Sequence, residues 1–336
     1  MNKKQLSNIN KFKKSSLPII ENVLIEPGKL TVTDLEVSYI VNHSIPVNDK
    51  CLISIEEFVK IARKYTIDEI VASNGRAVLV TGAGNFSFES EDIEEFPDIP
   101  SVDNNTGYKI TKETIDTYSS YMSKDDLRPA MCGIYFGDGI CATDGHRLRY
   151  DLNAGPGGEL AFILRSEAVA LITQDEYLHH LSNDEKESYE SAFFALKSEN
   201  ETIIYNEVCE KYVNFRAVIP TEFTQTFKFD SKEAKKYIEA ALITANKTTK
   251  QIRLQPDENT IRITAQELDL NKEYKSKTFG TVSNVESEEF QVGFNGGYFL
   301  DMLKNNPGKI EMKQGGANRA AVINGRELIM PVMLSA

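Results

Sequence analysis

The sequence has no run of about 18 apolar residues, the length that a helix needs to cross a membrane. Its first stretch, MNKKQLSNINKFKK, also lacks the apolar segment of a secretory signal. We therefore expect a cytoplasmic protein. Hydrophobic residues make up 41% and charged residues 26% of the 336 positions, a composition that excludes general disorder. The length suits two or three domains.

Cysteine and histidine are scarce, with four residues of each type. No two cysteines form a CxxC pair, and no histidine lies at ligand spacing from a cysteine, so we expect no metal site. Without a secretory signal, the cysteines are expected to be reduced core residues. The residues are Cys51, Cys132, Cys141, Cys209, His43, His146, His179 and His180.

The net charge of −12, taken as an average, argues against a nucleic-acid partner. The cations nevertheless gather on expected helices. Over residues 3–14, the 3.6-residue period puts Leu6, Ile9 and Phe12 on one face. The opposite face carries a lysine cluster: Lys3, Lys4, Lys11 and Lys14.

Two further expected helices repeat this arrangement. Ser54 and Glu57 form a capping-box pattern at the start of a helix over 54–65. A helix over 231–243 is less clean, because Glu239 shares its basic face. Cationic faces on an acidic chain favour a surface that holds a phosphate backbone without reading sequence. Their cations are Lys60, Arg63, Lys64, Lys232, Lys235 and Lys236.

A strand–turn–strand pattern recurs at 22–36, 133–147 and 251–268, with Thr33, Thr143 and Gln266 at the equivalent position. An Ile-Pro pair at 99–100 and another at 219–220 suit linkers between repeats. We expect three similar domains, at 1–103, 104–220 and 221–336. Each would place helices on one face of an antiparallel sheet, an α+β architecture.

The motifs that signal chemistry are few. No P-loop, HExxH or GxSxG is present, and the segment Gly82-Ala83-Gly84 leads into an expected strand. The group Thr143-Asp144-Gly145-His146-Arg147 could serve acid–base chemistry through Asp144 and His146. No nucleophile is tied to it in the sequence, so a binding role is favoured. We expect no catalytic residue and no cofactor.

Several segments carry a family resemblance. ATDGHRL at 142–148 and LIMPVML at 328–334 resemble the bacterial DNA sliding clamp, the beta subunit of DNA polymerase III. The segments 16–38, 94–100, 126–136, 213–220 and 293–303 also match, in the right order. The resemblance implies a head-to-tail homodimeric ring of six domains around duplex DNA. It further implies a processivity factor that tethers the replicative polymerase, and no chemistry of its own.

The resemblance also implies a pocket between the second and third domains. In the family, the polymerase and the clamp loader dock there a short peptide with a Gln and a hydrophobic-aromatic tail. Met131, Leu148, Val218, Leu328 and Met330 would form an apolar socket, with His146 and Arg147 as donors at its edge. The matching positions are Arg128, Met131, Thr143, Gly145, His146, Arg147, Leu148, Val213, Val218, Asn295, Tyr298, Leu328, Met330, Pro331 and Val332.

For the ring joint, the resemblance implies Phe86 and Phe88 on the first domain and Leu242 and Ile243 on the third. Phe86-Ser87-Phe88 alternates like an edge strand that needs a partner. The second domain supplies few DNA-facing cations, chiefly Lys112, Lys124 and Arg165.

The sequence departs from the family in several places. A first strand before the N-terminal helix is missing, Pro129 and Ala130 replace two aromatic-type residues, and Val213 replaces a proline at the pocket rim. Gly296-Gly297 precedes Tyr298. These departures indicate a divergent clamp. Two other interpretations stay open at this point: a peptide-binding scaffold that has lost ring closure, and a hydrolase that uses Asp144 and His146.

Overall fold

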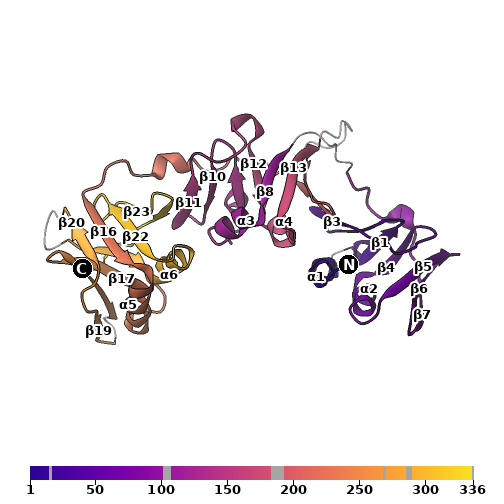
Figure 1. Ribbon diagram of the computed structural model, residues 1–336, viewed down its shortest axis with the longest axis horizontal. Coiled ribbons are helices and arrows are strands. Elements are labelled where there is room, and N and C mark those ends of the chain that lie inside the picture. The colour runs from indigo at the N-terminus through magenta and orange to yellow at the C-terminus, as the bar shows by residue number, and fades with distance from the viewer. Residues whose placement is uncertain (15–16, 101–106, 183–192, 268–269, 285–289, 335–336) are drawn as a thin grey trace. The chain divides into compact units, whose positions relative to one another are not determined.

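The computed structural model describes residues 1–14, 17–100, 107–182, 193–267, 270–284 and 290–334. Short helices pack on antiparallel sheets (Figure 1), which confirms the α+β class. The chain forms two compact units. Unit 1 contains Met1–Asp116 and Phe162–Glu210, and unit 2 contains Thr117–Ala161 and Lys211–Ala336. No helix among the described residues is long and apolar enough to cross a membrane.

Unit 1 is built on an eight-stranded sheet of order β4-β1-β2-β3-β15-β14-β13-β8. Its strands are β1 (Asn22–Glu26), β2 (Lys29–Thr33), β3 (Val37–Asn42), β4 (Cys51–Ser54), β8 (Tyr108–Thr111), β13 (Glu176–Ser182), β14 (Phe193–Lys197) and β15 (Glu201–Asn206). The pairing of β3 with β15 joins strands from the first and second repeats.

The remaining strands of unit 1 include a separate sheet of β5 (Ile67–Ser73), β6 (Arg76–Thr81) and β7 (Gly84–Glu89), with β7 at its edge (Figure 1). Strand β12 (Phe162–Arg165) leads into α4. The helices that begin in this unit are α1 (Lys3–Ile9), α2 (Ile55–Ala62), α3 (Lys112–Ser119) and α4 (Ser166–Leu171).

Unit 2 contains two sheets. Among its own strands, the first has the order β9-β10-β11-β24-β23-β22-β16-β20 and the second β19-β18-β17-β21. The elements are β9 (Gly133–Phe136), β10 (Ile140–Thr143), β11 (Arg147–Asp151), β16 (Gln225–Asp230), α5 (Ser231–Thr244), β17 (Gln251–Asp257), β18 (Thr260–Glu267), β19 (Lys272–Lys275), β20 (Thr281–Ser283), β21 (Val292–Asn295), α6 (Gly296–Asn305), β22 (Lys309–Gln314), β23 (Ala321–Ile323) and β24 (Glu327–Ile329).

In unit 2, the pairing of β11 with β24 joins strands from the second and third repeats. Each unit thus takes strands from two repeats, and the repeat boundaries expected near 103 and 220 stay a prediction.

Buried apolar stripes hold the helices in place. Leu6 and Ile9 of α1 are buried, and so are Ile55, Phe58 and Val59 of α2. Helix α1 packs on α2 and β3, and α5 packs on α6 and β18. The expected helices over 3–14, 54–65 and 231–243 are therefore confirmed, although the first ends as a 3₁₀ turn, Asn10–Phe12.

The repeat is visible in atomic detail at two turns. Thr33 Oγ1 donates to the Val37 carbonyl (3.2 Å), and Thr143 Oγ1 donates to the Arg147 carbonyl (2.8 Å). The amide of Leu35 donates to Thr33 Oγ1, and the amide of Gly145 donates to Thr143 Oγ1. A Thr-Asp pair therefore builds the same turn in the first and second repeats.

The Asp of each Thr-Asp pair completes the turn. Asp34 Oδ1 accepts from the amides of Glu36 and Val37, and Asp144 Oδ1 accepts from those of His146 and Arg147.

Four local expectations are wrong. Ser54 caps α2 without a side-chain hydrogen bond, so the capping box does not form. Gln266 lies inside β18, which continues to Glu267, whereas Thr33 and Thr143 each end their strand. Cys51 and Cys141 are buried as expected, but Cys132 is half-buried and Cys209 is exposed.

Candidate functional site

The Thr-Asp turn of the second repeat lies beside the last strand of the chain. Strand β11 pairs with β24, so that Leu148 faces Leu328 and Arg147 faces Ile329. The amide of Met330 donates to the carbonyl of His146 at 2.9 Å. This pairing brings together two segments that the sequence separates by about half the chain.

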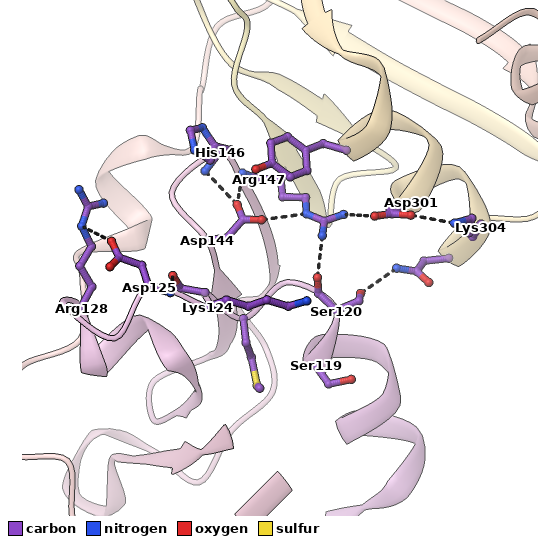
Figure 2. Close-up of a pocket in the computed structure, with 14 residues that line it drawn as sticks. Ser119, Ser120, Lys124, Asp125, Arg128, Asp144, His146, Arg147, Asp301 and Lys304 are labelled. Atoms are coloured by element: carbon purple, nitrogen blue, oxygen red, sulfur yellow. Dashed lines mark hydrogen bonds and ion pairs between the residues drawn. The ribbon is translucent and has the colours of Figure 1, made fainter. Parts of the chain in front are cut away.

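Arg147 is the most tightly held residue of this turn. Its Nε donates to Asp144 Oδ2 (3.1 Å), its Nη1 to Asp301 Oδ2 (3.4 Å) and its Nη2 to the Ser120 carbonyl (2.7 Å), as Figure 2 shows. Its side chain is 8% exposed. All three guanidinium nitrogens of Arg147 therefore serve the protein, and each Nη keeps a second N–H. The expectation that Arg147 offers donors to a ligand stays a prediction.

Two aromatic rings complete the surroundings of Arg147. Its guanidinium lies 5.2 Å from the centre of the Tyr121 ring and 5.0 Å from that of Tyr298. Tyr298 also stacks on the ring of His146, with centroids 5.4 Å apart. Burial, then the charge of Asp144, raises the pKa of Tyr298. Arg147 thus fixes the platform that His146 and Tyr298 present.

The apolar positions divide into two groups. Met131, Leu148 and Leu328 are buried, whereas Val218 and Met330 are 51% and 41% exposed. Only the second group has about half of its surface exposed to a ligand, so three of the five expected socket residues are buried in the core. Val213 is 40% exposed and lies just before the 3₁₀ turn Phe215–Val218.

Other expected pocket residues have structural roles. Thr143 holds the turn, and Asn295 caps α6 by accepting from the amides of Gly297 and Tyr298. Pro331 and Val332 are half-buried, and the Val332 amide donates to the Gly293 carbonyl at 2.9 Å.

Gly145 has a φ of +85°. A Cβ there would lie 3.5 Å from Met131 Cε and 3.6 Å from Arg128 Nη1. The glycine therefore keeps the space beside Met131 and Arg128 open.

A cavity of about 860 Å³ adjoins this turn. Arg128, His146, Arg147 and Tyr298 line it, as does Lys124, which was expected to face DNA from a helix and instead lies in the loop after α3 (Figure 2). Sequence reasoning missed the other lining residues, which come from the end of α3, the following loop, the Thr-Asp turn and α6. They are Ser119, Ser120, Met122, Ser123, Asp125, Asp301, Lys304 and Asn305; Asp144, singled out in the sequence for acid–base chemistry, also lines the cavity.

Asp144 is engaged in the fold. Its Oδ1 accepts two backbone amides of the turn and its Oδ2 accepts Arg147 Nε. A carboxylate held in this way is occupied by the turn and the guanidinium, which argues against the hydrolase interpretation.

The cations expected to face DNA fall into two groups. Eight are exposed and form no ion pair with another described residue: Lys3, Lys4, Lys14, Lys60, Arg63, Lys64, Lys232 and Lys236. The other five interact within the protein or line the cavity: Lys11, Lys112, Lys124, Arg165 and Lys235.

Two members of the second group show the difference. Lys11 Nζ donates to the Ala170 carbonyl at 2.6 Å, and burial lowers its pKa. Lys112 Nζ lies 2.6 Å from the Asp116 carboxylate. A lysine already paired in this way has less charge to offer a phosphate.

The residues expected at the ring joint are partly exposed. Phe86 and Phe88 are half-buried on the edge strand β7, and the Phe86 ring lies 5.9 Å from that of Tyr65. Ile243 is 85% exposed. Leu242 differs, because it packs where a Cβ on Gly296 would be only 2.9 Å away. Gly296 therefore allows α6 to approach α5, a reason for the glycine that the sequence did not reveal.

Comparison with known proteins finds relatives of this chain. A family model described as the DNA polymerase III beta subunit, C-terminal domain, matches residues 216–329. The "Beta sliding clamp" of Haemophilus influenzae is 25% identical over 312 residues, which cover 86% of this chain and 83% of that protein. The same protein of Vibrio cholerae is 22% identical, with 96% and 94% covered.

Solved structures with the same fold match nearly the whole chain. The DNA polymerase III subunit beta from Pseudomonas aeruginosa superposes with a TM-score of 0.82 at 19% identity, covering 98% of this chain and 97% of that one. The DNA polymerase sliding clamp from Bacillus subtilis gives 0.81 at 17% identity, covering 99% and 97%. The chain is therefore similar to the bacterial DNA sliding clamps in sequence and in fold. The resemblance seen in its sequence is confirmed, together with the fold that it implied.

Proposed function

We propose that this clamp closes as a head-to-tail homodimer around duplex DNA and tethers the replicative polymerase, acting without catalysis. The observation that carries the DNA contact is the set of eight exposed cations on or beside α1, α2 and α5, in a chain of net charge −12. Exposed lysines hold phosphates through charge and do not read bases. Weak contact of this kind suits a ring that slides.

The polymerase and the clamp loader would dock at the β11–β24 joint. Exposed Met330 and Val218 offer apolar surface, and the stacked His146 and Tyr298 form a firm edge. Methionine adapts its shape to different side chains, which suits a pocket that serves several partners. An apolar peptide tail is the ligand that this surface fits.

Dimer closure would pair the edge strand β7 with the third repeat of a second copy. Ile243→Asp places a charge at an exposed position of the proposed joint. The mass measured by light scattering should fall from that of a dimer, twice 37.7 kDa, to that of a monomer, 37.7 kDa. Leu160→Asp, at a position 53% exposed, is the matched control. A variant dimer that persists on dilution would remove Ile243 from the joint.

The decisive experiment is retention on DNA. The protein, loaded on a nicked circular plasmid by the clamp loader of its host, should elute with the circle and be lost when the circle is cut. A ring held by topology slides off free ends, whereas a bound protein does not. Equal retention on both forms would contradict the ring, and no retention with intact peptide binding would support the recruiting scaffold instead.

A further inference from the structure

Val218, which the proposed function places at the β11–β24 joint, ends the short 3₁₀ turn Phe215–Val218, and its side chain is exposed. A 3₁₀ turn of four residues makes few hydrogen bonds of its own. A segment this short does not fix its own orientation on the rest of the protein. The contacts that hold the turn therefore decide where the Val218 side chain lies.

Asp138, between β9 and β10, holds this turn through Arg216. Arg216 Nε donates to Asp138 Oδ2 at 2.9 Å, and Arg216 Nη2 donates to the Asp138 carbonyl. The other carboxylate oxygen, Oδ1, accepts from the Tyr135 hydroxyl at 3.1 Å. Asp138 thus uses two oxygens for the 3₁₀ turn and one for its own hairpin. A guanidinium that donates to two oxygens of one residue has a defined geometry, so the pair fixes how the turn lies on the hairpin.

Aromatic rings attach the same segment independently of the ion pair. The Phe215 ring is buried and lies 5.9 Å from that of Tyr135. Tyr135 also stacks on Tyr212, with ring centroids 5.0 Å apart, and the Tyr212 hydroxyl donates to the Cys141 carbonyl at 3.3 Å. Burial of these rings stabilises the attachment more than a half-exposed ion pair does. The ion pair therefore sets the orientation of the turn, and its loss should not unfold the protein.

Two glycines between β9 and β10 make room for the rings. A Cβ on Gly137 would overlap the Tyr135 hydroxyl. A Cβ on Gly139 would lie 2.9 Å from the Asp151 carbonyl oxygen and 3.4 Å from Phe215 Cζ. Neither glycine has a positive φ, so a left-handed backbone is not the reason for them. The hairpin turn is therefore shaped to accommodate Tyr135 and Phe215.

We propose that Asp138 and Arg216 are positioning residues for partner docking, which hold the turn so that Val218 meets the apolar tail of the docked peptide. The proposal rests on the proposed function, because it needs that tail to lie at the β11–β24 joint. With the ion pair intact, the turn is ordered before the peptide arrives. Without the pair, the peptide must itself order the turn, and that cost lowers the affinity.

Fluorescence anisotropy on the full-length protein tests this role, with a labelled peptide that has a Gln and a hydrophobic-aromatic tail. D138A and R216M each break the pair, and each should weaken binding by about 3- to 10-fold. The double variant D138A/R216M should bind no more weakly than either single variant, because both substitutions remove the same interaction. Thermal unfolding of these variants checks that the fold is retained.

Two comparisons separate positioning from a general effect. In a Val218→Ala background, breaking the pair should change the affinity by less than about twofold, because the side chain through which the pair acts is already shortened. R262M is the matched control. Arg262 Nε donates to Asp257 Oδ2 at 2.8 Å and its Nη1 to the Ser276 carbonyl, a similar arrangement on the β17–β18 hairpin. R262M should leave the affinity unaltered.

Other outcomes would overturn the positioning role. Normal affinity in both D138A and R216M rejects it while the docking pocket stands. A loss in R216M alone shows that Arg216 contacts the peptide directly, and an equal loss in the Val218→Ala background shows a general effect on the fold. If the parent protein does not bind the peptide, the docking pocket of the proposed function is rejected, and the positioning role with it.

Discussion

The two Thr-Asp turns have the same backbone and different side chains. The first presents Leu35, Glu36 and Val37, and the second presents Gly145, His146 and Arg147. In both turns, a backbone carbonyl also accepts a hydrogen bond from the end of the neighbouring strand. The Glu36 carbonyl accepts from the Asn206 amide at 3.1 Å, as the His146 carbonyl accepts from the Met330 amide at 2.9 Å.

The difference shows how one frame acquires two roles. The Thr-Asp pair sets the backbone and hence the strand pairing, while the three residues after it decide what the surface offers. Leu35 fills the position at which Gly145 leaves space, with a similar φ of +76°. Arg147 holds two aromatic rings, which a valine at the corresponding position cannot do.

A buried glutamate lies beyond each turn, and the two carboxylates have different hydrogen-bond partners. Glu201 of β15 is 1% exposed and accepts from Thr173, Gln174 and Tyr177, none of which is charged. Glu327 of β24 is fully buried and pairs with Arg149. The second joint therefore depends on a charge pair where the first uses neutral hydrogen bonds.

The largest expected effect comes from a substitution that breaks that charge pair. Arg149→Met leaves Glu327 buried without a cation and should lower the unfolding free energy by about 3–5 kcal/mol. The matched change at the first joint, Glu201→Gln, should cost about 1 kcal/mol, because it removes no cation and keeps hydrogen-bonding atoms. Urea unfolding of both variants measures the difference. Equal losses would show that the two joints are stabilised in the same way.

A smaller effect makes the second turn resemble the first. Gly145→Leu should fold, since Leu35 has a similar φ, at a cost of about 1–2 kcal/mol. The new side chain would occupy the space beside Met131 and Arg128 and weaken peptide binding by about tenfold, or 1.4 kcal/mol. Anisotropy measures the affinity and thermal unfolding the stability. The reverse change, Leu35→Gly, should leave the affinity unaltered, and a loss there would bring the first joint into the binding site.

The effect that distinguishes the two joints least is a decline of stability in alkali that both share. Burial raises the pKa of Tyr177 near the first joint to about 12, and that of Tyr118 near the second to about 12. The unfolded chain releases these protons near pH 10, so it binds fewer protons than the folded chain above that pH. Stability should therefore fall as the pH rises from about 10 to 12.

Thermal unfolding across that pH range tests the decline. Tyr118→Phe should reduce it, since phenylalanine has no proton to release. A midpoint that stays constant through this range would contradict the role of the buried tyrosines.

Local chemistry made part of this predictable. The Thr-Asp turns need only neighbouring residues, so the equivalence of Thr33 and Thr143 was visible in the sequence. Apolar spacing likewise located α1. The capping box at Ser54 is absent because the sequence pattern permits, but does not require, a hydrogen bond from a backbone amide to the Ser54 side chain.

The site depends on contacts that no local pattern contains. Arg147 and Asp301 meet across 154 positions, and the family resemblance, not the spacing, brought β11 and β24 together. The helical spacing of Tyr298, Asp301 and Asn305 places them on one face of α6, a signal that could have located one wall of the cavity. The opposite wall, at the end of α3, has no comparable signal.

The central claim is that the second joint binds partners and the first does not. Hydrogen–deuterium exchange, with and without a peptide that has a Gln and a hydrophobic-aromatic tail, tests it most directly. We expect added protection at 143–148 and 328–332, including the Met330 amide, and no change at 33–38 or 201–206. Protection at the first joint, or none at the second, would contradict the account.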